Sequence, residues 1–245
     1  MDFVAYGDVR HHPAVHREIA GQIAKTKPKF LLVTGDYVDH PDAEDEWAVF
    51  REIVRPLRAL GGYHAAVGDH DVGPREIFRK EFSLDGLYFD RHEGGLHVFV
   101  LDSRSLDAKQ LEWLEKTAAV SAAKHKFAVF HHPPFMIDRD RGHEAERVRV
   151  ALHPILVKHK FCAAFCGHQH SFYTTKRDGV RYVITAGGGA TLWKIDPTLG
   201  EKGDLSREFY HFVGCSIEGG KIAARVFDRE GGEAADLAFT LCEHP

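Results

Sequence analysis

The sequence predicts a mixed α/β protein built from two packed β-sheets with helices outside them. Short apolar segments rich in β-branched and aromatic residues alternate with amphipathic stretches through the first two thirds of the chain. The last third consists mostly of strand-like segments. No repeat or Pro/Gly/Ser-rich linker divides the 245 residues, so we expect a single domain over residues 1–245.

The predicted strands are short and apolar, and several are followed by Gly or Asp, which is typical of strands that end in a turn. In chain order they are Phe3–Tyr6, Phe30–Val33, Tyr63–Val67, His97–Leu101, Phe127–Phe130, Phe161–Cys166, Val180–Ala186, Phe212–Ile217, Ile222–Phe227 and Leu237–Leu241.

A helix is predicted over residues 43–58, where apolar residues recur at three-to-four spacing. Asp42 precedes this segment and is the expected N-cap, because its carboxylate can accept from the first amides of the helix. The residues on the apolar face are Trp47, Phe50, Val54 and Leu57.

Further helices are predicted from their capping patterns. Asp107 and Gln110 have the spacing of a capping box, and Pro13 suits the first turn of an earlier helix. Residues 141–158 predict a more polar helix, which we expect Pro154 to interrupt because proline lacks the amide hydrogen.

Composition excludes several classes of protein. Lys and Arg total 32 and Asp and Glu total 36, giving a formal charge of −4 without a basic cluster, which disfavours nucleic-acid binding. No apolar run approaches the roughly 20 residues that a membrane span needs. The first residues lack a basic n-region, so we expect no signal peptide and a cytoplasmic protein. The four cysteines form no Cys-x-x-Cys pair and are expected to be buried, reduced thiols.

Polar clusters follow five of the predicted strands. In open α/β sheets, ligands bind beyond the carboxyl ends of the strands, so these clusters can meet at one site. A Gly before an acidic residue suits a sharp exit from a strand, because Gly adopts backbone angles that other residues avoid. The clusters are Gly7-Asp8-Val9-Arg10, Gly35-Asp36-Tyr37-Val38-Asp39, Gly68-Asp69-His70-Asp71, His131-His132-Pro133-Pro134 and Gly167-His168-Gln169-His170.

The clusters supply carboxylates and imidazoles without thiolates, a ligand set that suits Mn, Fe or Zn. Taken singly, each cluster also has a structural explanation, as a turn, a helix cap or a polar strand end. Together they offer more ligands than one ion needs, and a shared carboxylate can hold two ions ~3.5–4 Å apart. The set therefore favours a two-metal site for phosphate transfer.

Together these residues resemble the calcineurin-like metallophosphoesterases, whose pattern is Asp-x-His, Gly-Asp-x-x-Asp, Gly-Asn-His-Asp or -Glu, a later strand-end His, and Gly-His-x-His. The resemblance runs from Asp8 to about Gly189, and its last part looks most like the purple acid phosphatase side of the family. It implies a four-layer αββα sandwich of two mixed β-sheets flanked by helices. It also implies hydrolysis of a phosphomonoester or phosphodiester by metal-bound hydroxide at a binuclear site.

The resemblance implies a role for each matching residue. His70 would be the general acid that protonates the leaving group, and Asp39 would orient it. The ions would be divalent or mixed-valence, with Mn or Fe favoured and Zn possible. The implied ligands are Asp8 and His170 for the first ion, Asp69, His131 and His168 for the second, and Asp36 for both.

Two residues depart from the family pattern. Arg10 stands where the pattern has a metal-binding His, and Asp69 stands where it usually has Asn. A guanidinium has no lone pair to give a metal, so we expect Arg10 to clamp the phosphate of the substrate instead. Two alternatives remain: Arg10 points to solvent with the first ion weak or absent, or the site binds metal without turnover. His11, His12 and His16 lie nearby, but none has the spacing of the missing ligand.

The sequence leaves the substrate open between a phosphodiester, such as a cyclic nucleotide, and a phosphomonoester or phosphoprotein. Specificity would come from the loops Pro41–Asp45, Gly73–Asp90 and Ile137–Glu146. The expected partner is a phosphorylated small molecule or nucleotide, with no membrane. His132 is either near the substrate or structural, and Tyr173 is expected in the core. The alternative function is a catalytically weak or inactive metal-binding scaffold with the same fold.

Overall fold

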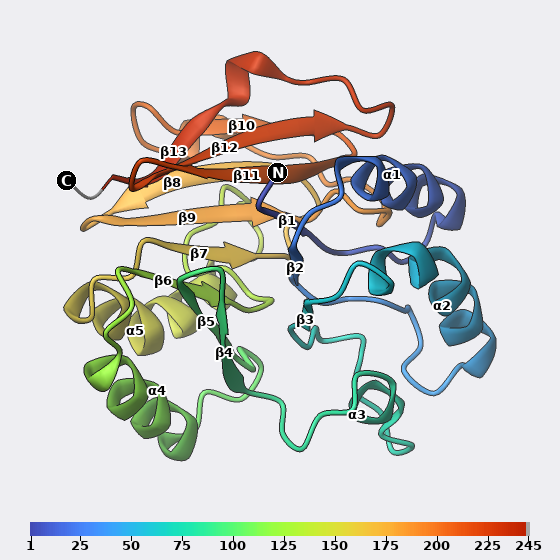
Figure 1. Cartoon of the computed structure of the whole chain (residues 1–245), viewed down its shortest axis with the longest axis horizontal. Helices are drawn as coiled ribbons and strands as arrows, with labels where there is room; N and C mark the ends of the chain where they lie inside the picture. Colours follow the sequence, from blue (N-terminus) through green and yellow to red (C-terminus); the bar gives the residue numbers. More distant parts are fainter. Residues whose placement is uncertain (244–245) are drawn as a thin grey trace.

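The computed structural model describes residues 1–243 and contains two mixed β-sheets packed face to face (Figure 1). The six-stranded sheet runs β13 (Phe239–Glu243), β12 (Lys221–Asp228), β11 (His211–Glu218), β1 (Phe3–Tyr6), β2 (Phe30–Val33) and β3 (Tyr63–Ala65). The seven-stranded sheet runs β10 (Leu205–Arg207), β8 (Phe172–Arg177), β9 (Val180–Thr185), β7 (Ala163–Cys166), β6 (His125–Val129), β5 (Leu96–Val100) and β4 (Phe89–Glu93).

Helices cover the outer face of each sheet, which gives four layers and confirms the predicted sandwich (Figure 1). Buried residues of α1 (Pro13–Thr26) and α2 (Glu44–Arg58) pack on the outer face of β1–β3. Those of α4 (Ala108–Val120) and α5 (Gly142–Lys158) pack on the seven-stranded sheet. The short α3 (Ile77–Glu81) lies in the connection from β3 to β4. None of the described helices is both long and apolar enough to cross a membrane.

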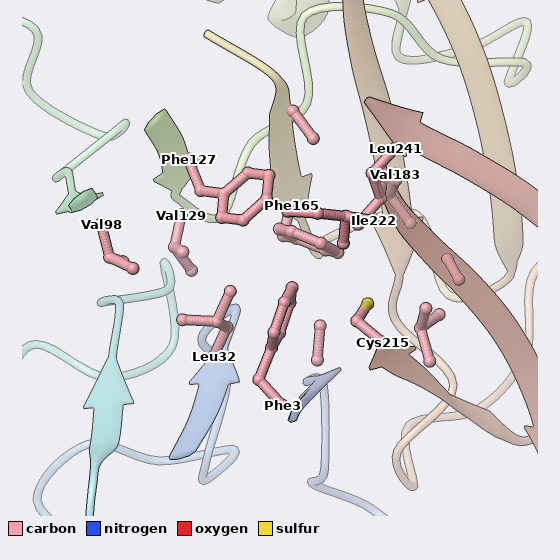
Figure 2. Close-up of a cluster of buried hydrophobic side chains, with 14 of the residues drawn as sticks. Phe3, Leu32, Val98, Phe127, Val129, Phe165, Val183, Cys215, Ile222 and Leu241 are labelled. Carbon is pink, nitrogen blue, oxygen red and sulfur yellow. The ribbon is translucent and has the colours of Figure 1, made fainter. Parts of the chain in front are cut away.

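The central core lies between the two sheets and is formed by side chains from both (Figure 2). Phe3 of β1 stacks on Phe30 of β2 at 5.0 Å between ring centroids. Across the interface, Phe3 contacts Phe127 of β6 at 5.6 Å and Phe165 of β7 at 6.0 Å. Because these strands are the ones that precede the polar clusters, this packing fixes the two sheets relative to each other at the site.

Within each sheet the strands that precede the clusters are parallel. β1, β2 and β3 pair in parallel, as do β5, β6, β7 and β9. Their carboxyl ends therefore lie along one edge of each sheet. The remaining pairs, such as β11 with β1 and β12 with β11, are antiparallel.

Three strands, one α-helix and two short 3₁₀-helices are not among the predicted elements: β4, β8, β10, α3, η1 (Pro197–Leu199) and η2 (Ala235–Leu237). β4 and β10 are edge strands whose sequences, FDRHE and LSR, carry little apolar patterning, and α3 has only five residues. β8 is buried at its start and follows the last polar cluster directly, so it lacks an apolar run bounded by turn residues.

The predicted helix ends are partly confirmed. Asp107 caps α4 by accepting from the Gln110 amide at 2.8 Å, and Pro13 stands in the first turn of α1. Asp42 does not cap α2, because its Oδ1 accepts from the amide of Arg75 in a neighbouring loop. Pro154 does not interrupt α5, which is continuous from Gly142 to Lys158. Proline has no amide hydrogen to donate to the carbonyl four residues earlier, which is that of the exposed Val150. Water can donate to this carbonyl instead of the missing amide.

The buried polar and sulfur-containing residues follow expectation in the main. The Tyr173 side chain is buried, and its hydroxyl donates to Asp204 Oδ2 at 2.7 Å, which supports the core assignment. None of the four cysteines forms a disulfide within the described residues. Three are buried as predicted, and Cys242 is half-buried.

Candidate metal centre

The five polar clusters meet at the carboxyl ends of β1, β2, β3, β6 and β7, where the two sheets come together. At this edge, hydrogen bonds from the clusters link the two sheets in addition to the hydrophobic core between them. The His168 amide after β7 donates to Asp8 Oδ1 after β1 at 3.0 Å. His131 Nδ1 after β6 bonds the carbonyl of Thr34 after β2 at 2.9 Å. The predicted convergence of the clusters is therefore present in the structure.

One group of possible ligands gathers around Asp69. Its Oδ1 lies 2.8 Å from His131 Nε2 and 3.4 Å from His168 Nδ1. Asp36 Oδ1 lies 3.5 Å from the same His131 nitrogen. These are the four residues that the sequence assigns to the second ion, and their ligand atoms face one another.

A second group contains Asp8, Asp36 and His170. The Asp8 side chain is fully buried, and its Oδ1 lies 3.5 Å from His170 Nε2. Oxygens of Asp8 and Asp36 and a nitrogen of His131 lie within 4.8 Å of one another. Burial and the nearby charge of Asp36 hold the pKa of Asp8 well above its usual range. This group is the one that the sequence assigns to the first ion.

Three imidazoles each use one ring nitrogen to fix the ring and turn the other toward carboxylates. The carbonyls of Thr34 and Thr191 accept from His131 Nδ1 and His170 Nδ1, and Glu144 Oε2 lies 2.6 Å from His168 Nε2. Since these partners can only accept a hydrogen bond, the nitrogen bonded to them carries a proton. The nitrogen that faces the carboxylates then has either a free lone pair or a second proton, which makes the ring positively charged.

The orientation of these rings fits metal ions. A lone pair that faces a carboxylate is repelled unless a cation lies between them, and metal-bound histidines have this tautomer-fixing contact on their other nitrogen. Asp8 Oδ2 is buried and has no hydrogen-bond partner among the described residues, which leaves one further oxygen for a cation. Carboxylate and imidazole donors suit Mn, Fe or Zn. The residues present therefore fit the ions that the sequence implies.

The electrostatic surroundings of the buried imidazoles support the same conclusion. Burial lowers the pKa of His131, but the carboxylates Asp36, Asp69 and Asp8 outweigh it and hold this pKa well above its usual range. His170 lacks such a close ring of carboxylates, and burial lowers its pKa to about 3, so its ring is neutral at neutral pH. A cation that replaces the proton on His131 would relieve the same excess of negative charge.

Arg10 lies inside the site rather than in solvent. Its side chain is 9% exposed, Nε donates to Asp36 Oδ2 at 3.1 Å, and Nη1 donates to Asp39 Oδ1 at 2.6 Å. The part of that alternative in which Arg10 points to solvent is therefore wrong. The guanidinium of Arg10 instead places a positive charge beside Asp36, the carboxylate that the sequence assigns to both ions.

His70 and Asp39 lie together, but through different atoms from those expected. His70 Nδ1 bonds the backbone carbonyl of Asp39 at 3.0 Å, while the Asp39 carboxylate, at 3.5 Å from this nitrogen, is taken by Arg10. His70 Nε2 lies 3.6 Å from Asp69 Oδ2, and the ring is 32% exposed. His70 is thus beside the candidate metal ligands and open to solvent.

Backbone strain accompanies the convergence. Three of the implied ligands have left-handed backbone angles, with φ of 55° at Asp8, 58° at Asp36 and 69° at His168. Such angles are costly for residues other than Gly and persist where the surrounding structure enforces them, most often at functional sites.

The glycines before the acidic residues are needed mainly for space. Only Gly35 has a positive φ, of 103°, so the predicted conformational reason holds there. A Cβ on Gly7 would lie 2.0 Å from Thr34 Oγ1, and one on Gly68 would lie 2.1 Å from Asp36 Oδ1. At these two positions the predicted reason is wrong: the missing side chain makes room for a side chain that follows β2.

Several residues of the site carry no role in the sequence pattern. Glu144, on the first turn of α5, orients His168 as described above. Asp71 is buried and accepts from the amides of Asp36, Tyr37 and Gly68, which fixes the turns after β2 and β3. Burial, together with the charge of Asp36, raises the pKa of Asp71 to about 7.

Aromatic and neutral groups complete the wall of the site. Trp193 lies over His170 at 4.4 Å between ring centroids, and the Arg141 guanidinium lies 3.5 Å from the Trp193 ring centre. His132 Nδ1 forms a hydrogen bond with Ser103 Oγ at 3.0 Å. Burial, together with the nearby charge of His131, lowers the pKa of His132 to about 2. Its contact with Ser103 supports the structural role, although its ring also adjoins the ligand cluster.

Comparisons with known proteins show what the chain is similar to. The family model described as calcineurin-like phosphoesterase matches residues 1–172. A probable cyclic nucleotide phosphodiesterase from Rhodococcus erythropolis is 30% identical over 223 residues, covering 82% of this chain and 70% of that protein. Purple acid phosphatase 18 from Arabidopsis thaliana is 23% identical, covering 73% of this chain but only 44% of that protein.

A solved structure confirms the fold over nearly the whole chain. Purple acid phosphatase PPD1 from yellow lupin superposes with a TM-score of 0.83 at 14% identity. The match covers 97% of this chain and 53% of the lupin chain, so the chain spans about half the length of the plant proteins that it resembles. With the family model matching well over half of its residues, the chain belongs to the calcineurin-like phosphoesterase family, a family of phosphoric ester hydrolases.

Proposed function

We propose that this chain hydrolyses a phosphomonoester or phosphodiester at a binuclear centre of divalent or mixed-valence ions, with Mn or Fe favoured and Zn possible. The observation that carries the proposal is the orientation of His131, His168 and His170, each fixed at one nitrogen and turned toward carboxylates at the other. When bound, the ions would polarise the phosphoryl oxygens and lower the pKa of water. Asp8, Asp36 and Asp69 would hold them with these imidazoles.

Arg10 would bind the phosphoryl group. Its Nε and Nη1 are bonded to Asp36 and Asp39, which leaves Nη2 for an oxygen of the substrate. The two carboxylates hold the guanidinium plane in place before the substrate arrives, so little side-chain entropy is lost on binding. In the transition state, where negative charge grows on the phosphoryl oxygens, this fixed charge would stabilise them further.

His70 would protonate the leaving oxygen. The Asp39 carbonyl fixes the ring at Nδ1, so Nε2 is the nitrogen that can give a proton to the substrate. The ring is 32% exposed, whereas His131 and His170 are buried, so a leaving alcohol can reach it. Asp39 would thus act as a positioning residue for both His70 and Arg10.

The alcohol part of the substrate has a candidate pocket beside Arg10. A cavity of about 380 Å³ lies between α1 and α2, with Val38, Phe50 and Ile53 on its apolar wall. Asp39, Asp45 and Glu46 give it acidic edges, which disfavour a second anionic group there. The pocket therefore favours an ester with an uncharged ring or apolar group. A cyclic nucleotide, the class named for the bacterial relative, meets this description.

The test is hydrolysis by metal-stripped protein after addition of Mn²⁺, Fe²⁺ or Zn²⁺. Bis-p-nitrophenyl phosphate, p-nitrophenyl phosphate and a cyclic nucleotide distinguish diester from monoester substrates. We expect turnover that returns with metal and is lost in Asp36→Asn, which keeps the size of the side chain. Asp178→Asn, at an exposed carboxylate in the turn between β8 and β9, is the matched control and should retain turnover.

A weak or inactive metal-binding scaffold is the second candidate, and the contact of Arg10 with Asp36 is the observation that favours it. A guanidinium on Asp36 Oδ2 competes with any ion for that oxygen. If the folded protein binds metal yet hydrolyses none of these esters with any of the ions, the scaffold is correct and the proposed hydrolysis is wrong.

A further inference from the structure

A second cluster of metal-ligating side chains lies at the opposite ends of two strands that lead to the phosphoesterase site. His125 is the first residue of β6, and Cys162 stands just before β7. The ligands His131 and His168 follow the other ends of the same strands. Cys242 joins the cluster from β13, which belongs to the other sheet and lies near the C-terminus (Figure 1).

The three side chains place one nitrogen and two sulfurs within 4.8 Å of one another. His125 Nδ1 lies 3.1 Å from Cys242 Sγ and 3.5 Å from Cys162 Sγ. In a tetrahedral zinc site with Zn–S of ~2.3 Å and Zn–N of ~2.0–2.1 Å, the nitrogen and sulfur ligands are about 3.5 Å apart. The spacing of these atoms is therefore close to that around a bound ion.

Hydrogen bonding alone serves this arrangement poorly. An imidazole nitrogen carries either one lone pair or one proton, so Nδ1 cannot make a good hydrogen bond to both sulfurs at once. Lys176 and Lys124 place positive charge near the Cys242 sulfur, and positive charge stabilises the thiolate that binds a metal.

The cluster is also held firmly and is open to ions. The Cys162 amide donates to the Lys126 carbonyl at 2.8 Å, and its carbonyl accepts from the Arg181 amide at 3.1 Å. His125 is 6% exposed, so its ring is packed in place. Cys162 and Cys242 both line a surface cavity of about 170 Å³, from which an ion and a water as fourth ligand can enter.

We propose that His125, Cys162 and Cys242 form a zinc site that ties β13 of the six-stranded sheet to the start of β6 and β7. Binding of Zn²⁺ displaces the two thiol protons to solvent and leaves the imidazole neutral, so the ion replaces two protons with its own two charges. The site is structural, and it is independent of the proposed function because no phosphoesterase residue takes part in it.

Cobalt binding to the full-length, reduced and metal-stripped protein tests this proposal. Because the phosphoesterase site has no thiols, a thiolate-to-cobalt charge-transfer band reports the Cys162–Cys242 site alone. We expect the final intensity of the band to correspond to one thiolate-bound Co²⁺ per chain, beside any cobalt taken up by the phosphoesterase site, and the band to vanish when Zn²⁺ is added. Cys162→Ser and Cys242→Ser should weaken the cobalt binding that produces the band by more than roughly 100-fold, more than loss of an outer-shell partner costs. Cys215→Ala, at a buried cysteine of β11, should keep it.

A second measurement avoids variants that fold poorly. In the unaltered protein, Zn²⁺ should slow alkylation of Cys242 by at least about tenfold, since a metal-bound thiolate is a weaker nucleophile. Absence of the cobalt band, a band that survives in both serine variants, or alkylation that Zn²⁺ leaves unchanged would overturn the proposal. A Cys162–Cys242 disulfide in protein isolated without reductant would assign the pair to a cross-link instead.

Discussion

Replacement of Arg10 by alanine should have a larger effect on the metal-free protein than on the metal-loaded one. The side chain is 9% exposed and its partner Asp36 is 1% exposed, so the pair is buried. Removal of one partner from a buried pair leaves an uncompensated charge and costs about 3–5 kcal/mol. The contact with Asp39 adds only ~0–1 kcal/mol, because that carboxylate is 37% exposed.

For a chain of this length, that loss lowers the Tm of the metal-free protein by roughly 6–20 °C. A bound ion beside Asp36 neutralises the same carboxylate, so the decrease should be much smaller when Mn²⁺ saturates the site. In the loaded enzyme, loss of the Arg10 charge from the phosphoryl oxygens should lower kcat/KM by about 10²–10³-fold.

Thermal unfolding with and without Mn²⁺, and steady-state hydrolysis of bis-p-nitrophenyl phosphate, measure the two effects. Arg17→Ala is the matched control, because Arg17 pairs with Glu52 at the surface with both side chains more than half exposed. It should cost no more than about 1 kcal/mol and leave kinetics unchanged. The reasoning is refuted if Arg10→Ala behaves like this control, with kcat and KM each changed by no more than about twofold.

Three further changes test other parts of the account. Glu144→Gln should weaken metal binding by roughly 10–100-fold in calorimetric titration, because the carboxylate that orients His168 is lost. His16 is buried with its pKa lowered to about 3, so below pH ~6.5 the unfolded state binds a proton that the folded state does not. Between about pH 7.5 and 5, the free energy of unfolding of the unaltered protein should therefore fall by about 2 kcal/mol more than that of His16→Leu, as measured by urea unfolding. Gly68→Ala should displace Asp36, abolish turnover and cost roughly 1–3 kcal/mol.

Nearby positions supply the controls. Glu146→Gln, on the same turn of α5 but exposed, should bind metal normally. Gly21→Ala, inside α1 with open space around the new Cβ, should raise stability by roughly 0.5–1 kcal/mol. Equal metal affinity in both glutamine variants, an unchanged acid dependence in His16→Leu, or an active Gly68→Ala enzyme would each contradict the corresponding contact.

The parts of the fold that the sequence predicts are those in which burial and backbone geometry act together. Phe3–Tyr6 and Phe30–Val33 are predicted residue for residue, because each is a wholly buried strand that ends in a turn. Edge strands such as β4 and β10 are polar and depend on a neighbour for their hydrogen bonds, so no local pattern marks them. The cap at Asp42 fails for a related reason, since a distant loop amide takes its carboxylate.

The residues of the site likewise fall into those that the sequence predicts and those that only the structure shows. The implied ligands converge because each follows a strand whose place in the sheet is fixed by its apolar residues. Glu144 lies on a helix and Trp193 in a loop, and neither has a spacing that relates it to the strands. The direction of Arg10 depends on which carboxylate is nearest in space, and sequence spacing carries no such information. The steric reason for Gly68 likewise needs the neighbouring Asp36 to be seen.

The central claim is that the carboxylates and imidazoles at the strand ends hold catalytic ions. Titration of Mn²⁺ into metal-stripped protein, with bound metal and hydrolysis of bis-p-nitrophenyl phosphate followed on the same sample, tests it most directly. The account predicts that turnover rises in step with occupancy and that Asp36→Asn loses both. Turnover that persists in the stripped protein, or full occupancy of the unaltered protein without hydrolysis of any phosphate ester, would contradict it.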